Sequence, residues 1–303
     1  MLKSEHHQKA IFALIIANII WGAASPIFKL ALSNFPPFSL AFLRFFGGML
    51  LLFPFVRKNL QVKKEDWLNL LLLSLFGISI NISFFFLGLE RAPSINAPII
   101  ASSGPVFLYL FAIIFLREKP HRKVFIGLVV SLIGVLTIVI QPLIEKGFTG
   151  NFIGNVFFVL ATFGAVGHAI FSKKIIYKYQ PITITFWSFW IGMITFIPFF
   201  SYELVNSNPF LKLDYRGFIG IFYGIIFSST LAYFLFEWGI KRIQAQETGL
   251  FTYIDPLAAI IIAVPFLGEK ITPVFTIGSI LVLTGIMIAE GRLQYHPFQK
   301  LRR

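Results

Sequence analysis

Residues 105–119 read PVFLYLFAIIFLREK and residues 256–270 read PLAAIIIAVPFLGEK, so one apolar segment that ends in a Glu-Lys pair occurs twice. The match extends without a gap to residues 88–134 and residues 239–285, and the stretches before these also align, with a shorter shift. The chain therefore consists of two copies of one unit. An internal repeat in an apolar chain of 303 residues is typical of a secondary transporter.

The composition is that of a membrane protein. Hydrophobic residues make up 57% of the chain and charged residues 13%, too few to cover a water-soluble domain. We expect an all-α integral membrane protein with ten transmembrane helices in two inverted five-helix repeats, residues 1–145 and residues 146–303. Ten apolar runs are long enough to cross about 30 Å of hydrocarbon: 10–31, 37–56, 66–89, 92–116, 124–141, 150–173, 181–201, 216–240, 245–267 and 273–290.

The distribution of basic residues predicts the topology. With the N-terminus inside, 19 Lys and Arg fall on the cytoplasmic side and five on the other side, so both termini are expected in the cytoplasm. The net charge of +13 is therefore a topology signal and does not indicate a nucleic-acid partner. Five helices per copy place the second copy upside down. In agreement, the loop at 117–123 carries four basic residues and its equivalent at 268–274 carries one.

Several motifs resemble the EamA-like family of the drug/metabolite transporter superfamily. They are WGAASPIFK at 21–29, Pro36-Pro37, Leu43-Arg44-Phe45, and in both copies a Pro followed by a Glu and two Gly seven residues apart. The resemblance covers nearly the whole chain. It implies a carrier of a prokaryotic inner membrane whose relatives mostly export amino acids and other small metabolites through a central cavity. Asp255 departs from the plain pattern, because many relatives have a small or neutral residue there.

Polar residues recur at helical spacing within the apolar runs. A polar face in lipid is costly, so each stripe is expected to face the bundle interior or water. The alternative for any single Ser, Thr or Asn is a hydrogen bond between helices. Because stripes from both copies converge, we expect a substrate-binding cavity lined by Asn18, Trp21, Ser25, Asn81, Ser103, Thr162, Ser229, Tyr233, Thr252 and Tyr253.

Three ionisable residues within the apolar runs are candidates for proton coupling. Asp255 directly precedes Pro256, and a midplane carboxylate persists against a penalty of about 2.5–3.5 kcal/mol. We expect it to exchange protons or to bind a substrate amine; the alternative is a structural carboxylate. His168 and Glu237 are the other candidates, with packing and pairing to Lys241 as their alternatives.

Arg44 is a basic residue about two turns inside the run 37–56. Snorkelling to the interface explains it less well than it explains Lys29, which lies near the end of its run. We expect a structural anchor. The alternatives are an ion pair with Asp255 and a contact with a substrate carboxylate.

Enzymatic function is not expected. The chain has no GxSxG, no HExxH and no Cys, and we predict neither a cofactor nor a metal. The expected function is secondary-active export of amino acids or similar small metabolites by alternating access. The partners are then the small-molecule substrate and membrane lipids, and a homodimer is compatible with the sequence. The alternative is a passive facilitator or a lipid-handling membrane protein, and dependence of flux on a proton gradient would separate them.

The topology can be tested with a reporter enzyme that is active only outside the cytoplasm. We expect no activity from fusions after Lys123 or after Arg303, because basic residues flank the cytoplasmic ends of the helices. A fusion within residues 202–214 should be active. An active reporter after Arg303 would contradict the even helix count.

Overall fold

The computed structural model describes residues 2–104, 106–107, 122–148, 150–240, 242 and 251–289. Every regular element in these ranges is helical, so the all-α prediction is confirmed. Seven helices in the described part are long and apolar enough to cross a membrane: His7–Leu32, Pro37–Val56, Lys64–Arg91, Arg122–Lys146, Gly150–Ser172, Pro181–Ser207 and Tyr215–Gly239. Two shorter apolar helices in this part are Ile254–Leu267 and Pro273–Ala289.

Several of these spans consist of more than one element. The third contains a π-helical segment at Leu75–Ile80 and the seventh another at Tyr223–Leu231. The α-helices of the described part are α1 (Leu2–Leu32), α2 (Pro37–Val56), α3 (Trp67–Ser74), α4 (Asn81–Arg91), α5 (Asn96–Ser102), α7 (Arg122–Lys146), α8 (Gly150–Ile175), α9 (Pro181–Ser207), α10 (Tyr215–Phe222), α11 (Ala232–Ile240), α13 (Ile254–Leu267) and α14 (Pro273–Ala289).

Three helix starts agree with the sequence predictions to the residue. Helices α2, α9 and α14 begin at the predicted residues Pro37, Pro181 and Pro273, because proline lacks the amide that a first helical turn leaves unused. Helix α9 continues to Ser207, six residues beyond the predicted end, so the predicted loop at 202–214 is shorter than expected. Only α5 is described within the predicted run 92–116.

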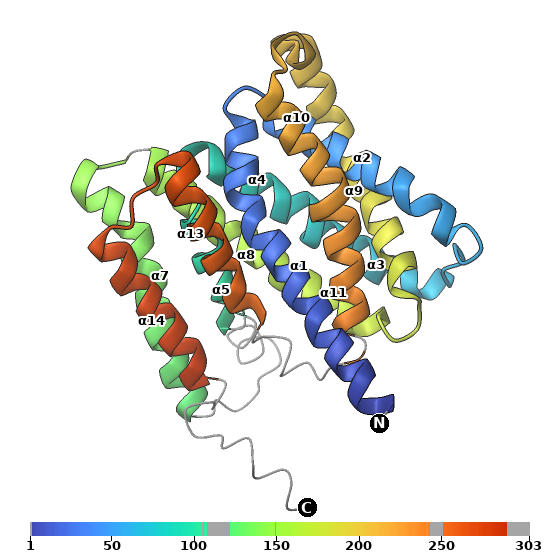
Figure 1. Ribbon diagram of the computed structural model, residues 1–303, viewed down its shortest axis with the longest axis horizontal. Coiled ribbons are helices and arrows are strands. Elements are labelled where there is room, and N and C mark those ends of the chain that lie inside the picture. Colours follow the sequence, from blue (N-terminus) through green and yellow to red (C-terminus); the bar gives the residue numbers. More distant parts are fainter. Residues whose placement is uncertain are drawn as a thin grey trace, which may run out of the picture.

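Helices α7 and α14 pack against each other through glycines (Figure 1). A Cβ atom on Gly127 would lie 2.4 Å from the carbonyl oxygen of Gly285, and one on Gly134 would lie 2.7 Å from that of Gly278. Rising residue numbers on one helix meet falling numbers on the other, so the two helices are antiparallel. The prediction that these glycines permit close packing is confirmed.

Helices α2 and α9 pack through phenylalanine. The ring centroids of Phe38 and Phe199 are 4.8 Å apart, and those of Phe45 and Phe189 are 5.3 Å apart, so this pair is also antiparallel. Many of the 38 Phe residues in the chain thus fill helix interfaces. In Figure 1 the α7–α14 pair stands at one side of the molecule and α2 and α9 at the other.

Two further contacts place α1 and α8 in similar surroundings. A Cβ atom on Gly239 of α11 would lie 2.6 Å from the Leu14 side chain of α1. A Cβ atom on Gly88 of α4 would lie 2.6 Å from the Phe158 side chain of α8. Gly88 and Gly239 are equivalent in the sequence repeat, so the same kind of contact occurs twice, each time between the two copies.

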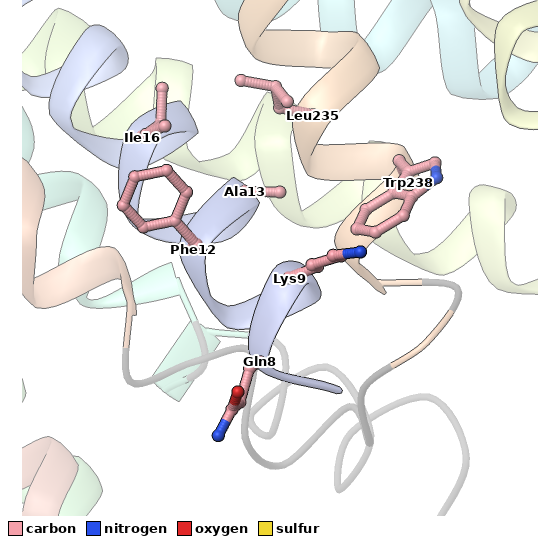
Figure 2. Close-up of a pocket in the computed structure, with 7 residues that line it drawn as sticks. All are labelled: Gln8, Lys9, Phe12, Ala13, Ile16, Leu235 and Trp238. Carbon is pink, nitrogen blue, oxygen red and sulfur yellow. The ribbon is translucent and has the colours of Figure 1, made fainter. Parts of the chain in front are cut away.

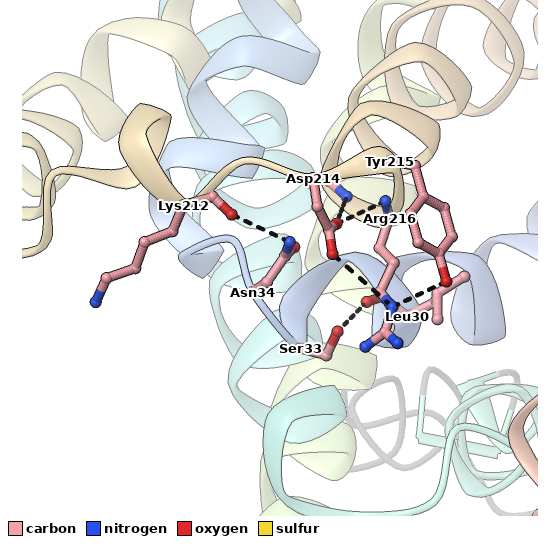
Figure 3. A network of polar contacts seen from close by, with 8 residues as sticks. Leu30, Ser33, Asn34, Lys212, Asp214, Tyr215 and Arg216 are labelled. Atoms are coloured by element: carbon pink, nitrogen blue, oxygen red, sulfur yellow. Dashed lines mark hydrogen bonds and ion pairs between the residues drawn. The ribbon is translucent and has the colours of Figure 1, made fainter.

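The loops gather on two opposite faces. On one face, the Lys178 ammonium donates to Asp66 at 2.7 Å, and this carboxylate raises the pKa of Lys178. On the other face, the end of α1 meets the start of α10 (Figure 3): Asn34 donates to the Lys212 carbonyl at 3.3 Å, and Asp214 caps α10. Loops that the charge pattern assigns to one side of the membrane thus lie together.

The glycine contact between α7 and α14 can be tested with Gly127→Leu. Its side chain would have to enter space held by the Gly285 backbone, and we expect a loss of about 1–3 kcal/mol or more and little folded protein. Val129→Leu is the matched control, because Val129 is on the same helix and exposed. Thermal melting in detergent measures the difference. Equal melting temperatures for the two variants would show that the contact does not determine stability.

Candidate functional site

Carboxylates near the ends of the membrane spans have hydrogen-bond partners. Asp66 accepts from Lys178 and from the Tyr179 hydroxyl, both at 2.7 Å. Glu269 accepts from the backbone amides of Ser94 and Ile95 at 2.7 and 3.1 Å. These acids satisfy amides and cations at the membrane interface, so their positions need no ligand to explain them.

Two carboxylates within the apolar spans differ from these. Glu237 in α11 is 3% exposed, and Asp255 lies in the first turn of α13. Within the described residues, neither forms an ion pair, and the Glu237 Oε2 and Asp255 Oδ1 atoms are buried without a hydrogen-bond partner. A buried polar atom without a partner is costly, so each of these oxygens needs a proton, a water or a ligand donor.

Asp255 does not lie where the sequence placed it. The predicted run 245–267 puts it near the middle of a helix, whereas α13 begins at Ile254 after a 3-10 turn at Phe251–Tyr253. A carboxylate in the first turn of a helix is favoured by the helix dipole. A Cβ atom on Gly22 would lie 2.4 Å from the Asp255 carbonyl oxygen, so α1 and α13 meet at this point.

Trp21 connects α1 to the seventh span, Tyr215–Gly239. Its indole nitrogen donates to the Ser228 carbonyl at 3.1 Å, within the π-helical segment. Such segments interrupt the regular hydrogen bonding of a helix and are frequent at functional sites. The Trp21 ring also contacts Tyr233 and Phe236, at centroid distances of 5.2 and 4.8 Å. Trp21 and Gly22 thus join α1 to the seventh span and to α13.

Asn18 adds a third acceptor to this region. Its amide nitrogen donates to the Leu14 carbonyl at 2.8 Å, while its Oδ1 atom is buried without a partner among the described residues. Asn18, Glu237 and Asp255 therefore present unsatisfied acceptors on α1 and on two of the elements that pack against it. Each of these oxygens, which we call together the acceptor cluster, can accept from an ammonium or hydroxyl group or take up a proton.

The other residues predicted to line the cavity on α1, the seventh span and α13 differ in their surroundings. Ser25 donates to the Gly22 carbonyl at 3.3 Å, and Ser229 accepts from Arg44 at 2.8 Å. Tyr253 packs partly buried against the main core. The Thr252 side chain lies outside the described part of the structure.

The predicted residues on α4, α5 and α8 have hydrogen-bond partners of their own. Asn81 joins α4 to α8 by donating to the Ala161 carbonyl at 2.7 Å, and Thr162 donates to the carbonyl four residues before it. The His168 Nδ1 atom lies 3.0 Å from the Leu73 carbonyl, and Ser103 donates to its own helix. Asn81 thus fits the interhelical alternative, whereas Thr162 and Ser103 bond within their own helices.

Sequence reasoning missed Tyr223 and the Ser228 carbonyl. Tyr223 donates to the Ile20 carbonyl of α1 at 2.7 Å. Tyr223 is six residues before Ser229, a spacing that does not place both on one face of a regular helix. The π-helical segment changes the spacing of residues that share a helix face. The sequence does not predict such a segment.

A shallow hollow of about 650 Å³ lies between α1 and α11 near the start of α1 (Figure 2). It is lined by Gln8, Lys9, Phe12, Ala13, Ile16, Leu235 and Trp238. None of the predicted substrate or coupling residues belongs to it, and Phe12 is 65% exposed at its edge. The hollow therefore lies on the outer surface of the bundle, separate from the acceptor cluster.

The EamA-like transporter family matches residues 8–140 and 152–290, and the chain belongs to this family. A probable amino-acid metabolite efflux pump of Escherichia coli is 25% identical over 97% of this chain and 98% of its own length. The uncharacterized transporter YyaM of Bacillus subtilis is 28% identical over 94% of each chain. A solved crystal structure shares the fold, with a TM-score of 0.64 and 16% identity, over 96% of this chain and all of that chain.

A tryptophan comparison tests the site. Trp21→Phe removes one hydrogen bond to a backbone carbonyl, which costs about 1 kcal/mol of stability. It should also weaken substrate affinity, because this bond holds the ring beside Tyr233. Trp187→Phe is the matched control, because its indole also donates to one backbone carbonyl, that of Leu60, at 3.0 Å. Both variants should lose similar stability, measured by thermal melting. Equal affinity changes in transport assays would place Trp21 outside the site.

Proposed function

We propose that this member of the EamA-like transporter family is a secondary-active exporter of amino acids or similar small metabolites. The observation that carries the proposal is the acceptor cluster, since Asn18, Glu237 and Asp255 hold buried oxygens without partners within the described residues. An ammonium group supplies several donors to such a cluster. The name of the Escherichia coli relative agrees with this substrate class.

We further propose the ten-helix plan with two inverted units, residues 1–145 and 146–303. In this plan α2 is equivalent to α9, and α7 to α14. Each of these pairs packs antiparallel, as helices related by inversion must. The two segments that match the family, 8–140 and 152–290, support the same division.

The proposed orientation puts both termini in the cytoplasm of a prokaryotic cell, with the protein in its inner membrane. The first residues of α1 and the last of α14 lie on the same side of the molecule (Figure 1), which supports an even number of crossings. Among the described loops, the basic ones at 57–66 and 174–180 contact each other, which supports their assignment to one side, the cytoplasm.

Alternating access is the proposed mechanism, and the contacts on the opposite face indicate what must move. Glu269, between α13 and α14, accepts from the amides of Ser94 and Ile95 before α5. Lys29 donates to the carbonyls of Leu89 and Ala92. The Glu269 contacts bridge the two copies in this structure, whereas the Lys29 contacts lie within the first copy and join α1 to the end of α4. Opening toward that face between the copies requires the Glu269 contacts to break.

The proposed coupling uses protons bound at Asp255 and Glu237. Both carboxylates have an oxygen without a partner among the described residues, so a proton or a substrate ammonium can occupy the same place. Competition between the two ligands would link export to proton uptake. His168 is a weaker candidate, because its ring nitrogen contacts the Leu73 carbonyl.

A lipid-handling role is the second candidate, and the hollow between α1 and α11 is the observation that favours it. Flux assays in proteoliposomes test both functions and also the passive alternative. An exporter of the proposed kind accumulates an amino acid against its gradient when a pH gradient is applied. Downhill flux without accumulation would support a facilitator, and movement of labelled phospholipid alone would support lipid handling.

Asp255→Asn tests the coupling. Asparagine keeps the shape of the side chain but cannot exchange a proton, so we expect substrate exchange to continue while pH-driven accumulation is lost. Asp214→Asn is the matched control, since Asp214 caps α10 outside the spans and asparagine caps helices equally well. Accumulation is measured with and without a pH gradient. Unchanged gradient-driven transport by the Asp255 variant would return this residue to a structural role.

A further inference from the structure

We infer that Arg44, together with Ser229 and Tyr233, binds the carboxylate of the transported substrate. The substrate class is then that of organic acids, including amino acids, and simple amines are excluded from tight binding. The inference rests on the proposed transport function and deepens it, because the acceptor cluster by itself is equally suited to an amine without a carboxylate.

The position of Arg44 is the first observation. The residue lies seven positions after the start of α2 and is 3% exposed. A guanidinium group keeps its charge in proteins, so a cation is buried within the bundle. No carboxylate of the described residues forms an ion pair with it. The predicted alternative of an ion pair with Asp255 is therefore not observed, and a buried charge of this kind calls for an anion.

The orientation of the guanidinium group is the second observation. Its Nε atom donates to the Ser229 hydroxyl at 2.8 Å, and its centre lies 5.0 Å from the Phe28 ring and 4.9 Å from the Phe45 ring. These contacts fix the plane of the group. The Nη1 and Nη2 atoms have no hydrogen bond within the described part of the chain. Two parallel N–H donors of this kind match the two oxygens of a carboxylate.

Tyr233 supplies the third observation. Its ring is held by Trp21 and Phe189, each at a centroid distance of 5.2 Å. Phe189 in turn contacts Phe45, the ring beside the Arg44 guanidinium, with ring centroids 5.3 Å apart. The hydroxyl of Tyr233 has no hydrogen bond to the described residues, unlike that of Tyr223. The Tyr233 hydroxyl is therefore a further donor for the same anion.

The arrangement along the seventh span gives the site a polarity. The seventh span carries Ser229, Tyr233 and Glu237 at intervals of four residues. Arg44 is bound to Ser229, the first of the three, and Glu237 is the last. Eight residues of helix rise by about 12 Å. A cation and an acid thus mark opposite ends of one stripe. The substrate carboxylate is therefore held at the Arg44 end of the stripe.

A purely structural role explains Arg44 less well. Lys29 shows how a structural cation is satisfied in this protein, because its ammonium group donates to the carbonyls of Leu89 and Ala92. Arg44 contacts one hydroxyl and two rings, and its remaining donors have no such partners in the described residues. The difference is consistent with a site that a mobile anion fills.

The test compares amino acids with their amides, which keep the amine and lose the negative charge. L-leucine and L-leucinamide, and L-phenylalanine and L-phenylalaninamide, are the probes. Binding is measured by thermal shift on the purified protein, and transport by counterflow in proteoliposomes. The native protein should prefer each acid over its amide by about 10- to 100-fold, as expected for hydrogen bonds to a charged group.

Arg44→Gln should abolish this preference by weakening acid binding while amide binding stays unchanged. Ser229→Ala, which removes the hydroxyl that orients the guanidinium, should reduce the preference and provides a second test if the Gln variant does not fold. Arg91→Gln is the control, because Arg91 is exposed and paired with Glu90, and it should keep the native ratio.

Two outcomes overturn the inference alone. They are an unchanged acid preference in both site variants, and a native protein that transports the amides as well as the acids. The second outcome leaves the exporter function in place. A native protein that neither binds nor transports any of the four probes would contradict the proposed function together with the inference.

Discussion

The cost of an unsatisfied polar group in hydrocarbon is the constraint on which the rest of this structure depends. Backbone groups meet it by forming helices, and no other regular element occurs in the described residues. Most side chains meet it by bonding to a neighbouring carbonyl or amide, as Asn81, Thr162 and Glu269 do. The few groups that do not meet it are therefore informative. Glu237 and Asp255 are such groups, and both adjoin α1.

The two π-helical segments lie at equivalent places in the sequence repeat and meet this constraint in related ways. In the second copy, Trp21 donates to the Ser228 carbonyl within the segment at Tyr223–Leu231. In the first copy, the His168 ring contacts the Leu73 carbonyl just before the segment at Leu75–Ile80. Each side chain comes from the helix that packs across the segment. In both cases a backbone carbonyl in or next to a π-helical segment forms a polar contact with a side chain of the helix that packs against it.

The two copies differ in the charges placed around these segments. The segment in the second copy contacts Arg44 through Ser229 and is followed by Tyr233 and Glu237. The first copy has Ile78 at the position that matches Ser229, and the neighbouring Ser79 hydroxyl shares a hydrogen bond with the Thr195 hydroxyl at 2.7 Å. One duplicated framework therefore holds two dissimilar interiors. The proposed substrate site lies at the π-helical segment of the second copy for this reason.

The sequence by itself determined the features that depend on local chemistry and on the solvent. Apolar runs required membrane-spanning helices, Pro37, Pro181 and Pro273 marked helix starts, and glycines seven residues apart marked a close helix contact. The sequence also indicated that Asp255 and Glu237 are costly. These conclusions need no knowledge of which helices are neighbours.

Only the tertiary structure decided which polar residues act together. Asn81 and Asn18 look alike in sequence, yet the Asn81 amide reaches a carbonyl of α8, whereas the Asn18 Oδ1 atom is left without a described partner. Arg44 and Lys29 are both cations within apolar runs, yet only Lys29 reaches backbone carbonyls. Such outcomes depend on distances between residues far apart in the chain. Helix packing sets those distances, and periodicity along one helix does not contain them.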